Sequence, residues 1–129
     1  MTDRKKPEKR RTRSKGRSRL KEATVLIPLT YNDGTVIPQA TIETLREELF
    51  ATFAGWTAEG TVQGAYRMES GAKRVESLLK ISVVLEDDQV ETLEDMVSRW
   101  GRELGQEAML LKIADLVVKF IPPRSAEES

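Results

Sequence analysis

The strongest hydrophobic pattern in the chain is the run from Leu78 to Leu85, where apolar side chains recur at every second position. In a strand, successive side chains point to opposite faces of the sheet. One face of this run is uniformly apolar and consists of Leu79, Ile81, Val83 and Leu85. The other face is mixed and consists of Leu78, Lys80, Ser82 and Val84. The run therefore predicts a central strand that is buried on at least one side.

Two earlier segments alternate in the same way. Residues 23–29 predict the first strand, whose apolar face consists of Ala23, Val25, Ile27 and Leu29. Residues 60–68 predict a strand that forms a hairpin with the Leu78 run. Gly64 interrupts this strand, which indicates a bulge or the close approach of another backbone.

The last apolar segment, residues 108–121, is ambiguous. It contains two apolar runs separated by Ala114 and Asp115. This pattern fits either one long strand with a break or a short hairpin. Pro122 and Pro123 end the segment, and we expect residues 122–129 to form a flexible C-terminus.

In two other segments, apolar residues recur with the 3.6-residue period of a helix. Residues 38–55 place Ile42, Leu45, Leu49, Phe50 and Phe53 on one stripe. Gly55 is the expected stop of this helix, and we expect Trp56, directly after it, to plug the core at the helix end.

The second helix is predicted between Asp88 and Gly105. Its apolar stripe consists of Val90, Leu93, Met96, Val97, Trp100 and Leu104. Asp88 and Glu91 have the spacing of a capping box at its start. Gly101, inside the helix, indicates that another group packs closely beside Trp100.

The predicted order is strand, helix, strand, strand, helix, strand. This βαββαβ order is typical of a ferredoxin-like α+β domain, in which an antiparallel sheet carries two helices on one face. We therefore expect one domain over residues 23–121, with the first strand and the Leu78 run in the middle of the sheet.

Composition removes many kinds of chemistry from consideration. The 129 residues include no Cys and no His, which excludes Cys/His zinc sites, Ser-His-Asp hydrolysis and thiol catalysis. No apolar stretch approaches the length of a membrane span, and no secretory signal core follows the N-terminus. We therefore expect a cytoplasmic protein without a metal or a cofactor, and no contact with a membrane.

The formal net charge of zero conceals a division between the two parts of the chain. Residues 1–22 contain 11 basic and 3 acidic residues, a charge of +8, and the remainder carries −8. The basic segment holds only Met1 and Leu20 as apolar side chains, so we expect a disordered tail.

Clustered basic residues favour binding to nucleic acid or to an acidic protein. The alternative is a solvated tail that only increases solubility. The candidate contact residues in the tail are Arg4, Lys5, Lys6, Lys9, Arg10, Arg11, Arg13, Lys15, Arg17, Arg19 and Lys21.

Three short motifs support a resemblance to a known group of proteins. They are Tyr31-Asn32-Asp33-Gly34, Gly64-Ala65-Tyr66-Arg67 and Gly105-Gln106-Glu107-Ala108. With these motifs, residues 23–121 resemble a family of small uncharacterised bacterial ferredoxin-like proteins. The resemblance implies a bacterial α+β domain and no particular activity.

Two surfaces are candidates for function. Polar side chains that could converge on a ligand are Tyr31, Asp33, Tyr66, Arg67 and Glu107, and a carboxylate beside Tyr or Arg could bind a small molecule or act as a base. Each also has an ordinary structural explanation as a turn, strand or helix-end residue, so an enzyme is the weaker of the two hypotheses.

The second candidate is the sheet face that the helices leave uncovered. Its predicted contact residues for self-association are Leu26, Leu78, Lys80 and Val84. Because monomers seldom expose large apolar patches, this face favours a homodimer. The leading hypothesis from the sequence is thus a non-enzymatic interaction module with a basic arm.

Overall fold

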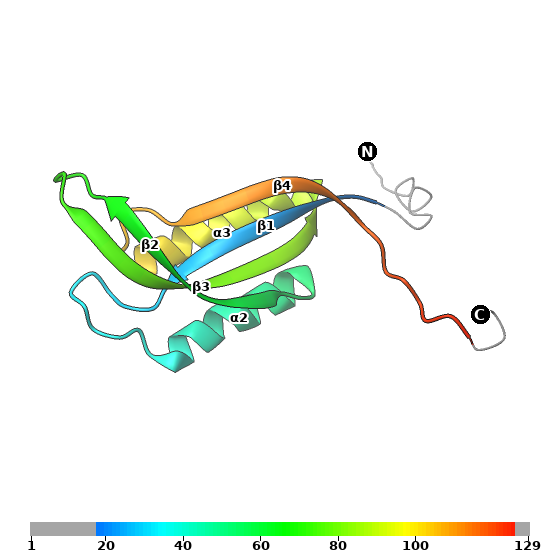
Figure 1. The fold of residues 1–129 in the computed structure, drawn as a ribbon, viewed down its shortest axis with the longest axis horizontal. Coiled ribbons are helices and arrows are strands. Elements are labelled where there is room, and N and C mark those ends of the chain that lie inside the picture. Colours follow the sequence, from blue (N-terminus) through cyan, green and yellow to red (C-terminus); the bar gives the residue numbers. More distant parts are fainter. Residues whose placement is uncertain (1–17, 126–129) are drawn as a thin grey trace.

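The computed structural model describes residues 18–125 (Figure 1). Its sheet is formed by β1 (Ser18–Pro28), β2 (Thr57–Arg67), β3 (Lys73–Glu86) and β4 (Leu110–Val118). The strands lie in the order β2-β3-β1-β4, and each pair of neighbours is antiparallel. β1 and β3 therefore occupy the middle, as the alternation of their apolar residues predicts.

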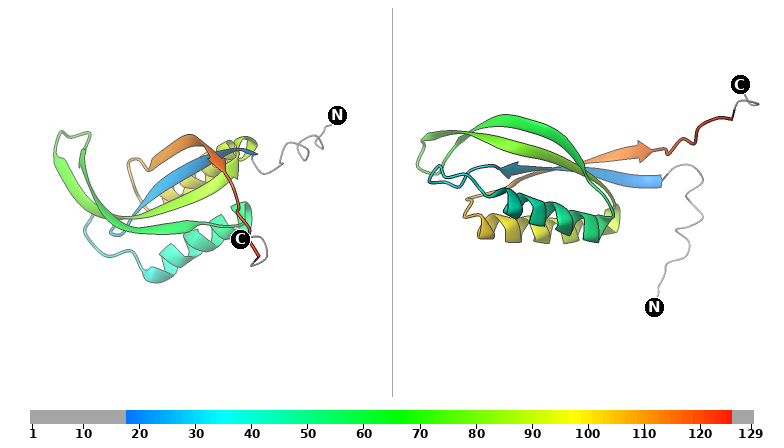
Figure 2. Two further views of the ribbon diagram at one scale, coloured as in Figure 1. Left: turned by 45° about the vertical axis from the view of Figure 1, so that its right-hand side comes forward. Right: turned by 90° about the horizontal axis from the view of Figure 1, so that it is seen from below.

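Two helices complete the structure, α2 (Gln39–Phe53) between β1 and β2, and α3 (Val90–Glu103) between β3 and β4. Both helices lie on the same side of the sheet (Figure 2). The prediction of an α+β domain with a four-stranded antiparallel sheet and two helices is confirmed. None of the helices within residues 18–125 is both long and apolar enough to cross a membrane.

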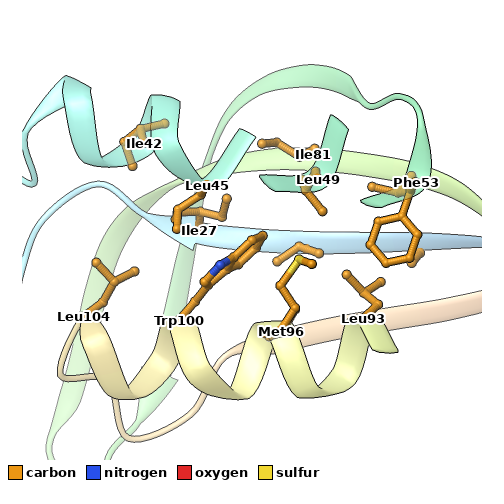
Figure 3. Packing of buried hydrophobic residues seen from close by; sticks show 14 of the residues in the cluster. Ile27, Ile42, Leu45, Leu49, Phe53, Ile81, Leu93, Met96, Trp100 and Leu104 are labelled. Carbon is orange, nitrogen blue, oxygen red and sulfur yellow. The ribbon is translucent and has the colours of Figure 1, made fainter. Parts of the chain in front are cut away.

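The core lies between the sheet and the two helices. Ala23, Val25 and Ile27 from β1 are fully buried there. Figure 3 shows side chains of α2 and α3 pointing toward one another beneath the strands. The largest buried side chain is Trp100 of α3, which fills the space between the two helices. The other buried residues are Ile37, Ile42, Leu45, Leu49, Phe53, Ile81, Val83, Leu85, Leu93, Met96, Val97 and Leu104.

The first strand is longer than its sequence predicts. It begins at Ser18, so the boundary predicted at residue 22 is wrong for residues 18–22. Leu20 pairs with Glu86 on one side and with Leu116 on the other. Backbone pairing on both sides stabilises this stretch although its side chains are mostly polar. The rest of the predicted tail, residues 1–17, lies outside the described residues.

At the other end of the sheet, β4 is one continuous strand from Leu110 to Val118. Its register with β1 runs unbroken through Ala114 and Asp115, which decides against the hairpin. Residues 119–125 follow as irregular chain, and residues 126–129 lie outside the described part.

Two aromatic residues lie outside the core, against prediction. Phe50 and Trp56 are both exposed. The residue in the left-handed conformation at the end of α2 is Ala54, with φ of 68°, and not Gly55. The chain after it places Trp56 outside, with the Arg46 guanidinium 5.1 Å from its ring centroid. This cation–π contact replaces the predicted core packing.

The start of the second helix also differs in detail. A 3-10 helix, η2 (Asp87–Gln89), precedes α3, and the reciprocal cap joins Glu86 and Gln89 and not Asp88 and Glu91. The prediction for Gly101 is confirmed, because a Cβ at this position would lie 3.0 Å from Cγ of Met109. Met109 therefore packs against the glycine on the way into β4.

A single carboxylate joins the two helices. Glu48 of α2 accepts a hydrogen bond of 2.9 Å from the Trp100 indole and pairs with the Arg99 guanidinium. Burial by itself would raise the pKa of Glu48, but the hydrogen bonds from Arg99 and Trp100 outweigh it and lower the pKa below the ordinary 4.5. The ionised carboxylate is thus the form that stabilises the fold.

We predict that Glu48→Gln lowers the free energy of unfolding at neutral pH by about 1–3 kcal/mol, because a charged acceptor of two hydrogen bonds is lost. In the unmodified protein, the contribution of Glu48 is present above pH 4.5 and is lost as pH falls through the lowered pKa. Urea unfolding of the variant should therefore change less between about pH 5 and 3. The exposed neighbour provides the control, since Glu47→Gln should leave both quantities unchanged.

Candidate functional site

Neither α2 nor α3 covers the sheet face that points away from them, and we call this face the open face (Figure 2). Directly opposed residues of neighbouring strands share a face, so the register defines its members. Its apolar members are Leu20, Leu26, Pro28, Val62, Leu78, Val84, Leu110, Leu116 and Val118. The open face therefore carries apolar residues on all four strands, interspersed with polar ones such as Glu22, Lys80 and Lys112.

All four predicted self-association residues belong to this face, but they differ in exposure. Val84 is 42% exposed, Leu26 is half-buried, and Leu78 is only 3% exposed. Leu78 lies directly opposite Val62 on β2 and Pro28 on β1, so it has apolar cross-strand neighbours on both sides. Leu78 is thus buried beneath the open face and offers little surface for a partner to contact.

Sequence reasoning missed the contribution of the last strand. Leu110 is 42% exposed and lies opposite Leu26 on the open face. Leu116 and Val118 continue the same face along β4. The apolar residues of segment 108–121 could have indicated this contribution. Because the sequence did not decide between one strand and a hairpin, these residues were not assigned to a face of the sheet.

The polar centre of the open face is internally compensated. Glu59, at the bulge of β2, accepts a hydrogen bond of 2.9 Å from the Ser82 hydroxyl and pairs with Lys80 at 3.2 Å. The hydrogen bonds from Ser82 and Lys80 lower the pKa of Glu59. A partner that covered this region would therefore meet a neutral pair and no isolated charge, which reduces the desolvation penalty.

Two of the five predicted ligand residues, Tyr31 and Asp33, have structural roles in the loop after β1. Tyr31 is half-buried and packs against the core. Asp33 accepts hydrogen bonds from the Thr35 amide at 2.9 Å and the Thr35 hydroxyl at 2.7 Å, which lower the pKa of its carboxyl group. This closed local arrangement is that of a turn residue.

The other three lie apart from one another. Tyr66 is on the open side of β2 and Arg67 on the opposite side, while Glu107 is an exposed residue between α3 and β4. Among the described residues, no hydrogen bond or ion pair joins two of the five candidate side chains. The small-molecule site stays a prediction without a geometric arrangement in its favour.

The same end of the molecule is nevertheless held together by other groups. The Asn32 side-chain amide donates to the Gly105 carbonyl at 2.7 Å, which joins the loop after β1 to the turn before β4. Arg74 of β3 donates to the carbonyls of Tyr31 and Asn32 at 3.3 and 3.5 Å. These contacts give a structural role to Asn32 of the first motif and to the backbone of Gly105 in the third.

Gly64 has a defined local role. A Cβ at Gly64 would collide with the ring of Tyr66, which lies across the glycine on the same face. The expected bulge lies instead between Ala58 and Thr61, where Gly60 has φ of 99°. Packing over Gly64 removes Tyr66 from water, and together with the Glu76 charge it raises the pKa of the phenol.

Basic residues of the predicted tail are described only where β1 contains them. The ammonium group of Lys21 pairs with Asp115 on β4 and, at 3.4 Å, with Asp87 at the start of η2. The hydrogen bond to Asp115 is the main cause that raises the pKa of Lys21. Lys21 therefore links β1 to β4 and to the start of η2. Arg19 lies in β1, and the other nine candidates precede Ser18 and lie outside the described residues.

Metal binding finds no support in this part of the chain. Within residues 18–125, no group of three acidic side chains has the arrangement of a metal site.

The fold resembles those of solved structures at low sequence identity. A phage SAM lyase in complex with S-methyl-5'-thioadenosine has a TM-score of 0.57 at 11% identity, over 78% of this chain and 90% of its own. A Bacillus cereus protein related to NIF3 has a TM-score of 0.52 at 11% identity, over 78% of this chain and 26% of its own. CutA from Synechococcus elongatus has a TM-score of 0.46 at 17% identity, over 80% and 78%. The first two, with TM-scores above 0.5, show a shared fold and leave the activity open.

No known protein family and no curated protein matches the sequence. The resemblance to a bacterial family in the three short motifs therefore stays a hypothesis, while its α+β character agrees with the observed fold.

We predict that Gly64→Ala displaces the Tyr66 ring and lowers the phenol pKa toward its ordinary 10.0. The measurement is the ultraviolet absorbance of tyrosinate as pH rises, in a Tyr31→Phe background that leaves Tyr66 as the only reporter. Ala65→Gly on the other side of the strand is the control. An unchanged titration in Gly64→Ala would contradict the proposed packing.

Proposed function

We propose that this protein is a non-enzymatic interaction module that associates with a second copy through the open face of a ferredoxin-like βαββαβ domain. The observation that carries the proposal is the apolar surface that Val84 and Leu110 expose on the open face, which no helix of residues 18–125 covers. The half-buried apolar side chains on the same face are Leu20, Leu26, Val62, Leu116 and Val118. Large apolar patches on the surface of a protein are typical of contact sites.

The second copy is the partner that the chemistry of this face favours. Two such faces present the same apolar side chains to each other, and a two-fold axis would pair Val84 and Leu110 with identical surfaces. The Lys80–Glu59 pair neutralises itself within each copy, so association does not leave either of these two charges without a partner. Sheets that pack face to face bury a common core between them.

The basic segment supplies a second contact in our proposal. We propose that residues 1–17 bind nucleic acid or an acidic partner through charge alone. They contain nine basic and two acidic residues and lead directly into β1. The segment contains no aromatic residue that could stack on bases, so the proposal includes no sequence preference.

We predict that the protein sediments as a dimer at micromolar concentration and that Val84→Lys converts it into a folded monomer. A Lys in the middle of an apolar interface would be buried without a partner. Val75→Lys is the matched control, because Val75 is an exposed residue of the same strand on the opposite face. A monomeric mass for the unmodified protein would end the proposal.

For the basic segment, we predict that full-length protein binds a labelled DNA duplex with an affinity that falls steeply with salt. Removal of residues 1–17 should abolish binding and leave β1 intact, since the strand begins at Ser18. Fluorescence anisotropy at two salt concentrations measures both effects. Equal, weak binding by the two forms would exclude nucleic acid as the target.

A further inference from the structure

The segment after β4 carries two adjacent large apolar side chains that are exposed. We call residues 119–125 the C-terminal arm. Phe120 is 85% exposed and Ile121 is 77% exposed, more than any other large apolar residue of the described chain. Figure 1 shows the arm leaving the body beyond the end of β4, and the second view of Figure 2 agrees. Two adjacent large side chains are thus left in water at the far end of the molecule.

The arm is also built to remain extended. Pro122 and Pro123 follow Ile121 directly, and their rings fix the backbone near polyproline geometry without an amide donor. An extended segment loses little conformational entropy when it binds, so its apolar side chains contribute more fully to affinity. These features are typical of a peptide segment that docks on another surface.

The apolar surface that suits the arm is the open face, but the arm of a given chain points away from its own. The arm leaves β4 at Val118, which pairs with Ser18 where the sheet ends. From there it runs past the end of the sheet and does not turn back over the strands (Figure 1). A second copy carries the same open face and so provides an apolar surface on which the arm can dock.

We propose that Phe120 and Ile121 of each copy dock on the edge strand β4 of its partner's open face, beside the surface that the two copies bury against each other, so that two reciprocal arms clasp the dimer. This inference rests on the proposed self-association. Exchange of identical segments between copies satisfies both arms at once under two-fold symmetry.

The location of the arm is tested by disulfide trapping, because the chain contains no Cys of its own. One variant carries Ser125→Cys in the arm, and a second carries Lys112→Cys, an exposed open-face position on β4. After the two are mixed and oxidised, mass spectrometry should find the linkage between residues 125 and 112 of different chains. Glu47→Cys on α2, near the exposed Phe50 and Trp56, is the control and should not be linked.

Affinity provides the second measurement. In the full chain, Phe120→Ser combined with Ile121→Ser should raise the dimer Kd at least about tenfold, since each dimer loses four buried apolar side chains. Val36→Ser combined with Phe50→Ser removes two other exposed apolar side chains and should leave the Kd unchanged.

The outcomes separate the two proposals. A dimer with unchanged Kd in the arm variant, and no linkage between residues 125 and 112, overturns the clasp and leaves self-association standing. A monomeric unmodified protein overturns both. A further variant carries Ser125→Cys and Lys112→Cys in the same chain. Linkage within that chain, with none between chains, shows that the arm folds back and also overturns the clasp.

Discussion

The structure depends on the contact between its two helices beneath the sheet. Trp100 is fully buried there, and its indole needs an acceptor because a buried N–H without one is costly. Glu48 of α2 supplies that acceptor, while Arg99 neutralises its charge. A single side chain thus fixes the spacing of both helices under the strands.

This arrangement determines where function can lie. With both helices on one side, the other side of the sheet receives no cover from secondary structure, although β1 and β3 carry apolar residues there as well. The bulge in β2 adds Glu59 to this surface and removes the isolated charge of Lys80. The open face is therefore a consequence of how the core is assembled, and it is suited to being covered.

Much of this was predictable from the sequence. The alternation of Ile81, Val83 and Leu85 is local, so it identified the buried side of β3 and, by exclusion, Val84 on the open side. The same local rule could not detect the start of β1 at Ser18, where pairing with β3 and β4 stabilises a polar stretch. Backbone pairing leaves no mark on side-chain hydrophobicity.

Other errors arose where three-dimensional placement decides between similar residues. Trp56 comes directly after the apolar stripe of α2, and Trp100 belongs to the apolar stripe of α3. The orientation of α2 and its end at Ala54 put Trp56 outside the core, whereas Trp100 is buried in it. The polar residues of the loop motifs were ambiguous for a related reason. Their partners, such as Gly105 for Asn32, are distant in the sequence.

One consequence concerns the long axis of the molecule. The start of β1 and the end of β4 lie side by side at one end, while the tip of the β2–β3 hairpin, closed by a 2.8 Å hydrogen bond from Gly71 to Met68, lies at the other (Figure 1). A fluorophore or affinity handle attached just before β1 or just after β4 would therefore crowd the end of the sheet from which the arm leaves. The hairpin tip offers an attachment point that keeps such cargo a full domain length away.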